Sequence, residues 1–211
     1  MSGVVRIGVL ALQGAFREHL EVLNRLGVKG LEVRRPEHLS GCEGLILPGG
    51  ETTAQRKLAK ACGLWDTIRE AGQSGLPVLA TCAGLILLAS EVDLPDGYYR
   101  DAGPAEEGET SLGLLDLDVL RNAYGRQVHS FEASLEVPCL EGLPHGNGLF
   151  PAIFIRAPRI LRAGKAVSVL SCWNGDPVAV EQGNVLGLAF HPELTHDDRF
   201  HRYFLGHIGR R

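Results

Sequence analysis

The sequence predicts an α/β fold in which helices cover both faces of a largely parallel sheet. In the first half of the chain, short runs rich in β-branched residues alternate with segments of helical periodicity. The length of 211 residues, 45% of them hydrophobic and 22% charged, suits a single domain, residues 1–211, with a full core. No linker rich in Pro, Gly and Ser divides the sequence.

The first half of the chain supplies the elements on which this prediction rests. Its expected strands are short and largely apolar. The first expected helix repeats apolar residues at Phe16, Leu20, Leu23 and Leu26, and Gly27 ends it. A break near Gly63 is expected in the second helix. In chain order, strands are expected at residues 4–12, 31–36, 44–50 and 77–80, and helices at residues 14–27, 53–72 and 83–91.

The second half has a different pattern, closer to a β-meander than to alternating strands and helices. Its short apolar runs are separated by turn sequences such as NGDP and QGN. The acidic, non-periodic segment 101–111 is expected to be an exposed loop, and the segment 196–209 an amphipathic helix. Strands are expected within residues 112–123, 131–138, 152–158 and 166–193.

Charge and cysteine content argue against several classes of protein. The formal net charge is −4 and neither sign forms a long block, which argues against a nucleic acid or an anionic membrane as the main partner. The five cysteines include no C-x-x-C pair, so we expect reduced thiols and a cytoplasmic location. Residues 1–16 lack the features of a signal peptide, and no apolar run reaches the length of a membrane span.

Cys82 stands between two apolar runs in the segment LPVLATCAGLILLA, residues 76–89. A strand followed at once by a helix places this thiol at a sharp turn, at the carboxyl edge of the sheet where open α/β folds bind ligands. Free N–H groups at a helix N-terminus stabilise a thiolate and can receive an oxyanion. Cys82 is therefore a candidate nucleophile, and a packed core cysteine is the alternative that this segment alone leaves open.

His191 is the candidate base for this nucleophile. It ends an apolar strand in LGLAFHPEL, and Glu193 follows two residues later. In an extended segment these side chains point to the same side, so the carboxylate can fix the tautomer of the imidazole. With Cys82 they supply the nucleophile, base and orienting group that thiol acyl transfer requires. For H-P-E alone, a turn histidine without a catalytic role is the alternative.

A glycine turn closes the strand in LILPGGETT, residues 45–53. Paired glycines let the backbone approach a ligand closely and present N–H groups to it. One N–H donor from this turn, at Gly50, and one from Ala83 would form an oxyanion hole, which is usually a large term in acyl transfer. By itself, P-G-G is more often only a turn.

Six segments occur in an order that resembles a known family. They are LALQGAFREH, LILPGGETT, ATCAGLILLA, RNAYGRQ, FIRAP and FHPELTHDDRFH. Over nearly the whole chain they resemble the glutaminase subunits of pyridoxal 5′-phosphate synthases, which are class I glutamine amidotransferases. The cysteine and H-P-E are common to the superfamily, whereas LQGA, RNAYGRQ and FIRAP indicate the vitamin B6 branch. The resemblance implies a flavodoxin-like three-layer sandwich around a mixed, largely parallel sheet.

The resemblance also implies a role for each site residue. Cys82, His191 and Glu193 would form the catalytic triad, and Gln13 would lie in a segment that assembles the oxyanion hole when a partner binds. The family usually has Gly where Ala80 stands and Ser where Thr52 stands, so the turn and the pocket depart slightly from its pattern. The residues that would contact glutamine are Gly50, Glu51, Thr52, Arg121, Ile155 and Arg156.

The charged residues in this set suit free glutamine. Arg121 or Arg156 can hold the α-carboxylate through two parallel hydrogen bonds, and Glu51 can face the ammonium group. A surface ion pair is the alternative for each arginine. Asp197 and His201 have the spacing of two metal ligands on a helix, but a solvent-facing helix surface rich in His and Asp is commoner. We therefore assign no metal and no other cofactor.

The expected reaction is hydrolysis of L-glutamine to glutamate and ammonia through a γ-glutamyl thioester on Cys82. Free ammonia would be mostly protonated and lost in bulk water, so a partner must receive it directly. The sequence offers no site for a sugar phosphate, which makes that partner a separate chain. The resemblance implies a (β/α)8-barrel synthase subunit, bound in a hetero-oligomer.

Three alternatives remain at this point. An amidotransferase subunit of another pathway, such as histidine or purine synthesis, would share the triad but not RNAYGRQ and FIRAP. A cysteine peptidase or hydrolase on a similar sheet would need no partner and no charged handles for glutamine. A non-catalytic binding subunit of the same fold would be marked by loss of Cys82, His191 or Glu193, and all three are present.

Overall fold

The computed structural model describes residues 5–93, 111–121, 130–144 and 148–208. Two segments considered above therefore lie outside the described residues. They are most of the acidic segment, residues 101–110, and the part of RNAYGRQ that follows Arg121.

A seven-stranded sheet forms the centre of the molecule, in the order β10-β11-β12-β4-β3-β1-β2. From β12 to β2 all neighbouring strands are parallel, whereas β10, β11 and β12 pair antiparallel. The mixed, largely parallel sheet expected from the sequence is therefore confirmed. Its strands are β1 (Arg6–Leu10), β2 (Lys29–Val33), β3 (Gly44–Leu47), β4 (Val78–Thr81), β10 (Ser168–Trp173), β11 (Asp176–Gln182) and β12 (Val185–Leu188).

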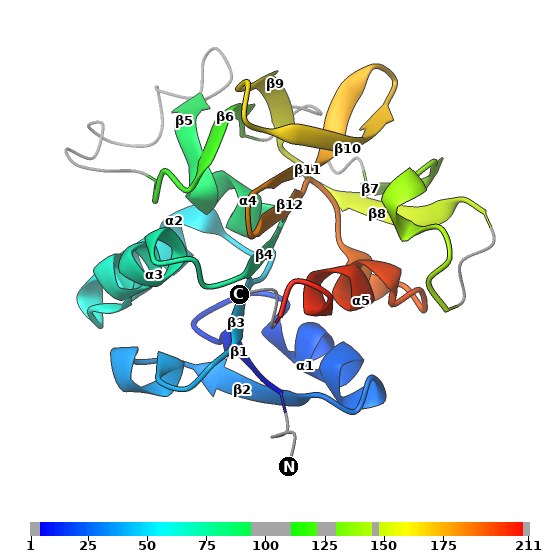
Figure 1. Cartoon of the computed structure of the whole chain (residues 1–211). Helices are drawn as coiled ribbons and strands as arrows, with labels where there is room; N and C mark the ends of the chain where they lie inside the picture. Colours follow the sequence, from blue (N-terminus) through cyan, green and yellow to red (C-terminus); the bar gives the residue numbers. More distant parts are fainter. Residues whose placement is uncertain (1–4, 94–110, 122–129, 145–147, 209–211) are drawn as a thin grey trace.

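Helices cover both faces of this sheet, as expected. In Figure 1, α2 and α3 lie on one side of the sheet, and α1 and α5 lie on the other. Strands β3 and β4 are buried along their whole length, as parallel strands between two helical layers must be. The helices are α1 (Phe16–Arg25), α2 (Thr52–Ala61), α3 (Leu64–Gln73), α4 (Ala83–Leu88) and α5 (Arg199–Leu205).

Close packing between β4, α4 and β3 holds the turn that carries Cys82. A Cβ atom on Gly84 would collide with the backbone carbonyl of Leu47, so only glycine lets α4 approach β3 this closely. Ala80, where the resemblance predicted glycine, is fully buried. The adjoining strand β12 has Gly187 at the paired position. The alanine is thus accommodated inside the sheet, with Cys82 still at its carboxyl edge.

Two small sheets lie beyond one end of the central sheet (Figure 1). One contains β5 (Ala89–Asp93), β6 (Leu115–Leu120) and β9 (Arg159–Ala163), and the other is the antiparallel pair of β7 (Ser130–Leu135) and β8 (Phe150–Ile155). Strand β6 ends next to Arg121, and β8 ends at Ile155, next to Arg156. The small sheets therefore bring three predicted substrate-binding residues to the end of the central sheet.

The expected helices differ from the observed ones in two places. The break at Gly63 is confirmed, because this residue adopts the left-handed conformation (φ 76°) between α2 and α3. The helix expected at residues 83–91 is wrong in its second part, because α4 ends at Leu88 and β5 starts at Ala89 to pair with β6. The helix expected at residues 196–209 is shorter, because residues 196–198 are not helical and α5 ends at Leu205.

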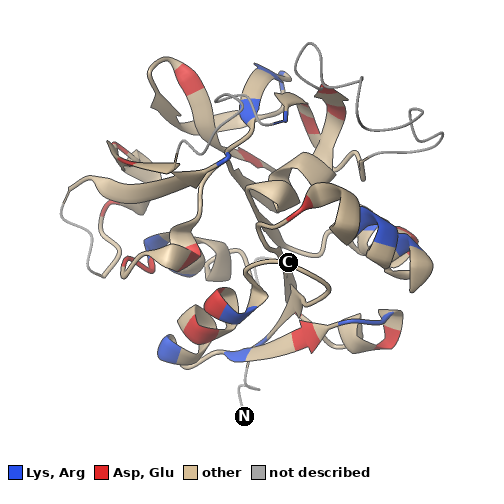
Figure 2. Ribbon diagram, turned by 180° about the vertical axis from the view of Figure 1, so that it is seen from behind, with Lys and Arg blue, Asp and Glu red and all other residues tan. Residues whose placement is uncertain are grey.

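Charged residues are spread over the described surface. Figure 2 shows basic and acidic residues interspersed among the elements, and the basic residues of α2, Arg56, Lys57 and Lys60, stand together on that helix. Within the described ranges, none of the helices has the length and apolar character needed to cross a membrane.

A cluster of phenylalanines joins β8, α5 and the end of β12, and it provides a test of the packing. Phe150, Phe190 and Phe200 are fully buried, and the rings of Phe150 and Phe200 meet edge to face at 4.7 Å. We expect Phe200→Ala to lower the free energy of unfolding by about 3–5 kcal/mol in urea titrations. Leu161→Ala is the control, with a change within about 0.5 kcal/mol because Leu161 is 48% exposed. Equal effects of the two substitutions would contradict this account of the core.

Candidate active site

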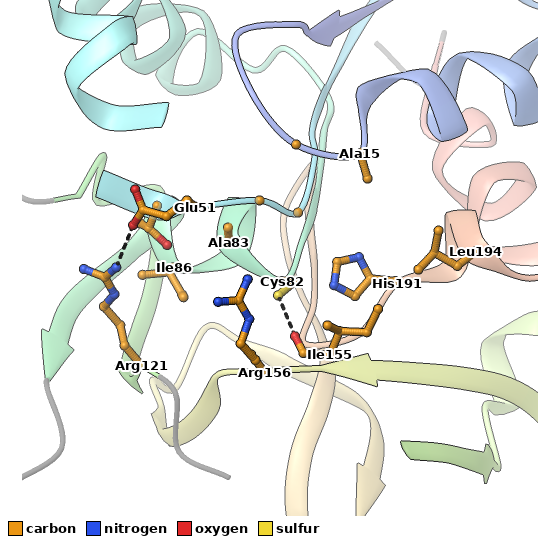
Figure 3. Close-up of a pocket in the computed structure, with 14 residues that line it drawn as sticks. Ala15, Glu51, Cys82, Ala83, Ile86, Arg121, Ile155, Arg156, His191 and Leu194 are labelled. Atoms are coloured by element: carbon orange, nitrogen blue, oxygen red, sulfur yellow. Dashed lines mark hydrogen bonds and ion pairs between the residues drawn. The ribbon is translucent and has the colours of Figure 1, made fainter. Parts of the chain in front are cut away.

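Cys82 occupies a strained turn between β4 and α4. Its φ of 47° lies in a region that residues with a side chain seldom adopt. Its backbone N–H donates to the Leu188 carbonyl at 2.8 Å, which ties the turn to β12. Cys82 is 6% exposed, and its thiol donates to the Ile155 carbonyl at 3.7 Å (Figure 3). Strain of this kind is typical of functional sites, and here it directs the sulfur into a pocket.

His191 and Glu193 meet as predicted, but through a different backbone conformation. The expected extended segment is wrong, because Pro192–Leu194 form a 3₁₀ turn at the end of β12. Within this turn His191 Nδ1 lies 2.7 Å from Glu193 Oε1. Both side chains are almost fully buried, and the His191 N–H donates to the Ile153 carbonyl at 2.9 Å. The carboxylate thus fixes the imidazole and leaves its other nitrogen free to face the pocket.

The charge state of His191 follows from its two neighbours. Burial disfavours the imidazolium, but interactions with Cys82 and Glu193 outweigh burial and raise the pKa of His191 to about 10. Burial also acts to raise the pKa of Glu193, but His19 and His191 more than reverse it, so the pKa lies below its ordinary value. At neutral pH the site therefore holds a protonated imidazole beside an ionised carboxylate.

The glycine turn after β3 packs directly on the triad. A Cβ atom on Gly49 would overlap the His191 ring, and one on Gly50 would overlap the Gln13 side chain. The Gly49 N–H donates to the Thr81 hydroxyl at 3.0 Å, and the Gly49 carbonyl accepts from the Ala15 N–H at 3.0 Å. Hydrogen bonds of both the N–H and the carbonyl of Gly49 thus hold the turn within contact distance of His191.

Gln13 supports this turn and is absent from the pocket lining. Its side-chain oxygen accepts from the Glu51 N–H at 2.7 Å, and its backbone carbonyl accepts from the Gln55 side chain at 2.9 Å. Gln55 also donates to the Pro48 carbonyl. These bonds connect the loop after β1 to the start of α2, on either side of the glycine turn.

One cavity of about 280 Å³ brings most of the predicted site residues together. Glu193 and Gln13 do not line it and act from behind. The predicted residues in its wall are Cys82, Ala83, His191, Gly50, Glu51, Thr52, Arg121, Ile155 and Arg156. Four lining residues were not predicted, namely Gly14, Ala15, Ile86 and Leu194, and the fifth addition, Gly49, belongs to the glycine turn that was expected to approach a ligand.

The charged wall of the cavity distinguishes its two arginines. Glu51 caps α2, because its carboxylate accepts from the Thr53 and Ala54 N–H groups at 2.9 and 2.6 Å. Burial acts against the ionised form, but these two donors and Arg121 outweigh it and lower the pKa of Glu51. Arg121 lies 3.5 Å from this carboxylate, so it already has an anionic partner.

Arg156 is placed differently. It also has a strained backbone, with φ of 46°, and its side chain points into the cavity (Figure 3). No Asp or Glu in the described part of the chain lies within ion-pair distance of Arg156. Of the two arginines that can hold a carboxylate, Arg156 is thus the one without an acidic partner among the residues described.

The expected solvent-facing position of His201 is wrong. This residue is fully buried, and its Nε2 lies 3.0 Å from Nδ1 of His19, which is also fully buried. Asp197 instead pairs with Arg199, at 2.6 Å, so it does not face His201 as a second metal ligand would. His19 was not among the predicted residues, although the step from Phe16 to His19 places it on the apolar side of the first helix.

The contribution of Cys82 to the charge of His191 can be measured. We expect Cys82→Ala to lower the pKa of His191 from about 10, because one of the two groups that raise it is removed. Cys172→Ala is the control, because Cys172 is exposed and does not line the cavity. Proton NMR titration of the imidazole signals would give both values. An unchanged titration of His191 in Cys82→Ala would contradict the interaction.

The chain is similar to known proteins over nearly its whole length. Residues 9–210 match the family described as "SNO glutamine amidotransferase family". The "Pyridoxal 5'-phosphate synthase subunit PdxT" of Thermotoga neapolitana is 48% identical over 201 residues, which are 95% of this chain and 98% of the relative. The protein of the same name from Pelotomaculum thermopropionicum is also 48% identical, over 95% of this chain and 94% of its own.

Solved structures extend the comparison to the fold. A crystal structure of a glutamine amidotransferase superposes with a TM-score of 0.82 at 49% identity, covering 98% of this chain and 100% of that one. The structure of PurLQS from Thermotoga maritima shares the fold with a TM-score of 0.72 at 18% identity, covering 97% and 99% of the two chains. The predicted fold class is thereby confirmed, and the chain belongs to the SNO glutamine amidotransferase family.

Proposed function

We propose that this protein is the glutaminase subunit of a pyridoxal 5′-phosphate synthase, acting as one domain over residues 1–211. The observation that carries the proposal is the juxtaposition of strained Cys82 with His191 in one cavity, with Glu193 bound to His191 behind it, in a chain 48% identical to PdxT proteins. The described cysteines are free thiols, which supports a cytoplasmic location.

The B6 branch is favoured over other amidotransferase pathways by the level of similarity. The relatives named as PdxT are 48% identical over 95% of the chain, whereas PurLQS and a putative GMP synthase subunit share 18% and 16% identity. The two latter likenesses concern the fold alone. A peptidase of similar fold is disfavoured by the cavity, whose charged residues Glu51, Arg121 and Arg156 suit a small zwitterion.

In the first half of the proposed reaction, Cys82 gives its proton to the His191 imidazole and attacks the side-chain amide carbon of glutamine as the thiolate. The sulfur–carbon bond forms, and the oxyanion is held by the N–H groups of Gly50 and Ala83. His191, which is protonated at neutral pH because its pKa is raised to about 10, gives its proton to the departing nitrogen. Ammonia leaves, and a γ-glutamyl thioester remains on Cys82.

The second half requires His191 to act as a base, and formation of the thioester makes this possible. An acylated sulfur carries no negative charge and no proton to share, so the contribution of Cys82 to the raised pKa of His191 is lost. The neutral imidazole then takes a proton from water as water attacks the thioester. Glutamate is released, and the thiolate and imidazolium are restored. One histidine thus serves as acid and then as base.

The charged wall of the cavity would orient the substrate. We assign the α-carboxylate of glutamine to Arg156, which has no acidic partner among the described residues, and the ammonium group to Glu51. Arg121 would hold Glu51 ionised and in place, and Thr52 and Ile155 would complete the wall. With the α-carboxylate held by Arg156, the distance from Arg156 to Cys82 then selects a substrate with the side-chain length of glutamine.

The ammonia would pass to a separate synthase chain of the (β/α)8-barrel type, within a hetero-oligomer. PdxT is named as a subunit of pyridoxal 5′-phosphate synthase, which supports assembly with a synthase subunit. The catalytic cavity opens at the end of the central sheet, between the glycine turn and the small sheets, where a second chain can cover it.

Glutamate release from glutamine tests this function. We expect weak activity from the isolated chain, stimulation by the synthase chain, and a loss of at least about 10³-fold in Cys82→Ala because the nucleophile is removed. Cys172→Ala should retain full activity, because Cys172 lies away from the cavity. Unchanged turnover in Cys82→Ala would exclude the mechanism. Failure of the synthase chain to bind or stimulate would exclude the pathway.

The assignment of Arg156 can be tested with Arg156→Lys, which keeps the charge but not the two parallel donors. We expect KM for glutamine to rise by about 10-fold or more, with kcat changed less. Arg121→Lys is the matched comparison and should raise KM less, because Arg121 acts through Glu51. Steady-state kinetics with the synthase chain present would give these values. A larger KM effect in Arg121→Lys would reverse the assignment.

A further inference from the structure

A pair of buried histidines lies behind the triad, outside the cavity. His19 comes from α1 and His201 from α5, and both are fully buried. His19 Nδ1 lies 3.0 Å from His201 Nε2, and the two rings are 5.2 Å apart between centroids. Burying two imidazoles away from solvent is unfavourable unless their nitrogens form hydrogen bonds. The role of the pair therefore depends on what the second nitrogen of His19 contacts.

That second nitrogen faces the triad. His19 Nε2 lies 3.5 Å from Glu193 Oε2 and 3.3 Å from the Thr81 hydroxyl. His191 contacts Glu193 Oε1. His19 therefore approaches the other oxygen of the carboxylate, which His191 does not contact. Thr81 precedes Cys82 in the chain and also accepts from the Gly49 N–H at 3.0 Å. One imidazole therefore touches the carboxylate of the triad and the residue that joins the Cys82 turn to the glycine turn.

Hydrogen-bond accounting selects one arrangement of protons. If His19 donated from Nδ1, His201 would carry its proton on Nδ1, which has no partner, and a lone pair of His19 would face the Glu193 carboxylate. An unpaired buried N–H and a lone pair opposite a carboxylate are both unfavourable. With the proton on Nε2 of each ring, His201 donates to His19, and His19 donates to the Thr81 hydroxyl and points the same N–H at Glu193 Oε2, a buried oxygen with no hydrogen-bond partner within normal bonding distance among the described residues. Of the nitrogens of the two rings, only the Nδ1 lone pair of His201 then stays unpaired in the described part of the chain.

We propose that His19 is a positioning residue for the triad, which holds Glu193 and Thr81 through its Nε2–H while His201 fixes its tautomer. The proposal rests on the proposed glutaminase function. His19 does not line the cavity and contacts no reacting atom. Its effect reaches the chemistry through the Glu193–His191 pair and through the two backbone turns that Thr81 connects.

The charges around His19 agree with a neutral ring. Burial lowers the pKa of His19 and outweighs Glu193 and Glu18, which act to raise it, while His191 acts to lower it further. Burial, His19 and Arg25 all lower the pKa of His201. The lowered pKa values of both imidazoles favour the neutral rings that the hydrogen-bond arrangement requires, and the N–H dipole of His19 favours the ionised state of Glu193.

Two substitutions at His19 distinguish positioning from packing. Gln places an amide N–H where Nε2–H stands, whereas Leu has similar bulk and no donor. With the synthase chain present, we expect His19→Leu to lower kcat for glutamine hydrolysis by about 10- to 100-fold, with KM changed less than about 2-fold. His19→Gln should recover most of kcat. The acid limb of the kcat–pH profile should move to higher pH in His19→Leu, because Glu193 loses the nearby N–H that favours its ionised form.

His201 is tested in a double-mutant cycle. We expect His201→Phe to lower kcat by a smaller factor than His19→Leu, and to have no further effect in the His19→Leu background, because His201 acts only through His19. His207→Leu is the matched control. His207 is likewise buried and lies 3.3 Å from a carboxylate, that of Glu181, but it does not touch the triad. It should leave kcat and the pH profile unchanged even where the melting temperature falls.

Several results would overturn the proposal. These are wild-type kcat and pH profile in His19→Leu, equal losses in His19→Leu and His19→Gln, or equal effects of His207→Leu. Alkylation of Cys82 by iodoacetamide, followed by mass spectrometry, gives a readout that does not depend on glutamine. A wild-type protein that hydrolyses no glutamine would refute the proposed function, and the alkylation rate in His19→Leu would still report on the role of His19: a rate equal to wild type overturns it.

Discussion

The active site depends on keeping a buried carboxylate ionised. Glu193 has no exposed side-chain surface, and an isolated charge in such a place is strongly disfavoured. His191 on one oxygen and His19 near the other supply the compensating interactions. These partners come from the turn after β12 and from α1. The charge state of Glu193 therefore depends on the packing of two elements that are far apart in the sequence.

The requirement explains several features of the surrounding structure. Gly49 must lack a side chain because the imidazole that pairs with Glu193 lies against it. Thr81 must supply a hydroxyl oxygen at the end of β4, because both the Gly49 N–H and His19 form hydrogen bonds with it. The 3₁₀ turn at Pro192 places the Glu193 carboxylate against the His191 ring, whereas an extended chain would place it farther along the strand direction. The central sheet supplies the strand ends from which these parts converge.

The triad was predictable because its members follow recognisable patterns at the ends of strands. Cys82 stands between two apolar runs, and H-P-E follows another, so the parallel sheet alone places them at one edge. The geometry that joins His191 to Glu193 was not predictable from alternation, because it depends on a local turn. Strand β5 was missed because its partner, β6, lies beyond a long segment and overrides the local helical preference. His19 and His201 were missed for a similar reason: each is polar in sequence, and their burial results from contact between helices at opposite ends of the chain.

The backbone bond between the His191 N–H and the Ile153 carbonyl has a consequence for local opening. It attaches β8, which leads to Ile155 and Arg156, to the triad histidine itself. Within the described residues, the β7–β8 pair is joined to the central sheet by side-chain packing, with Phe150 and Phe154 of β8 fully buried against Phe190, and not by strand pairing. Any opening of this pair would release the substrate wall and the imidazole in one event. Hydrogen exchange at the His191 amide then reports the fraction of molecules that are competent for both binding and chemistry, while the amides of β3 and β4 report only on global unfolding.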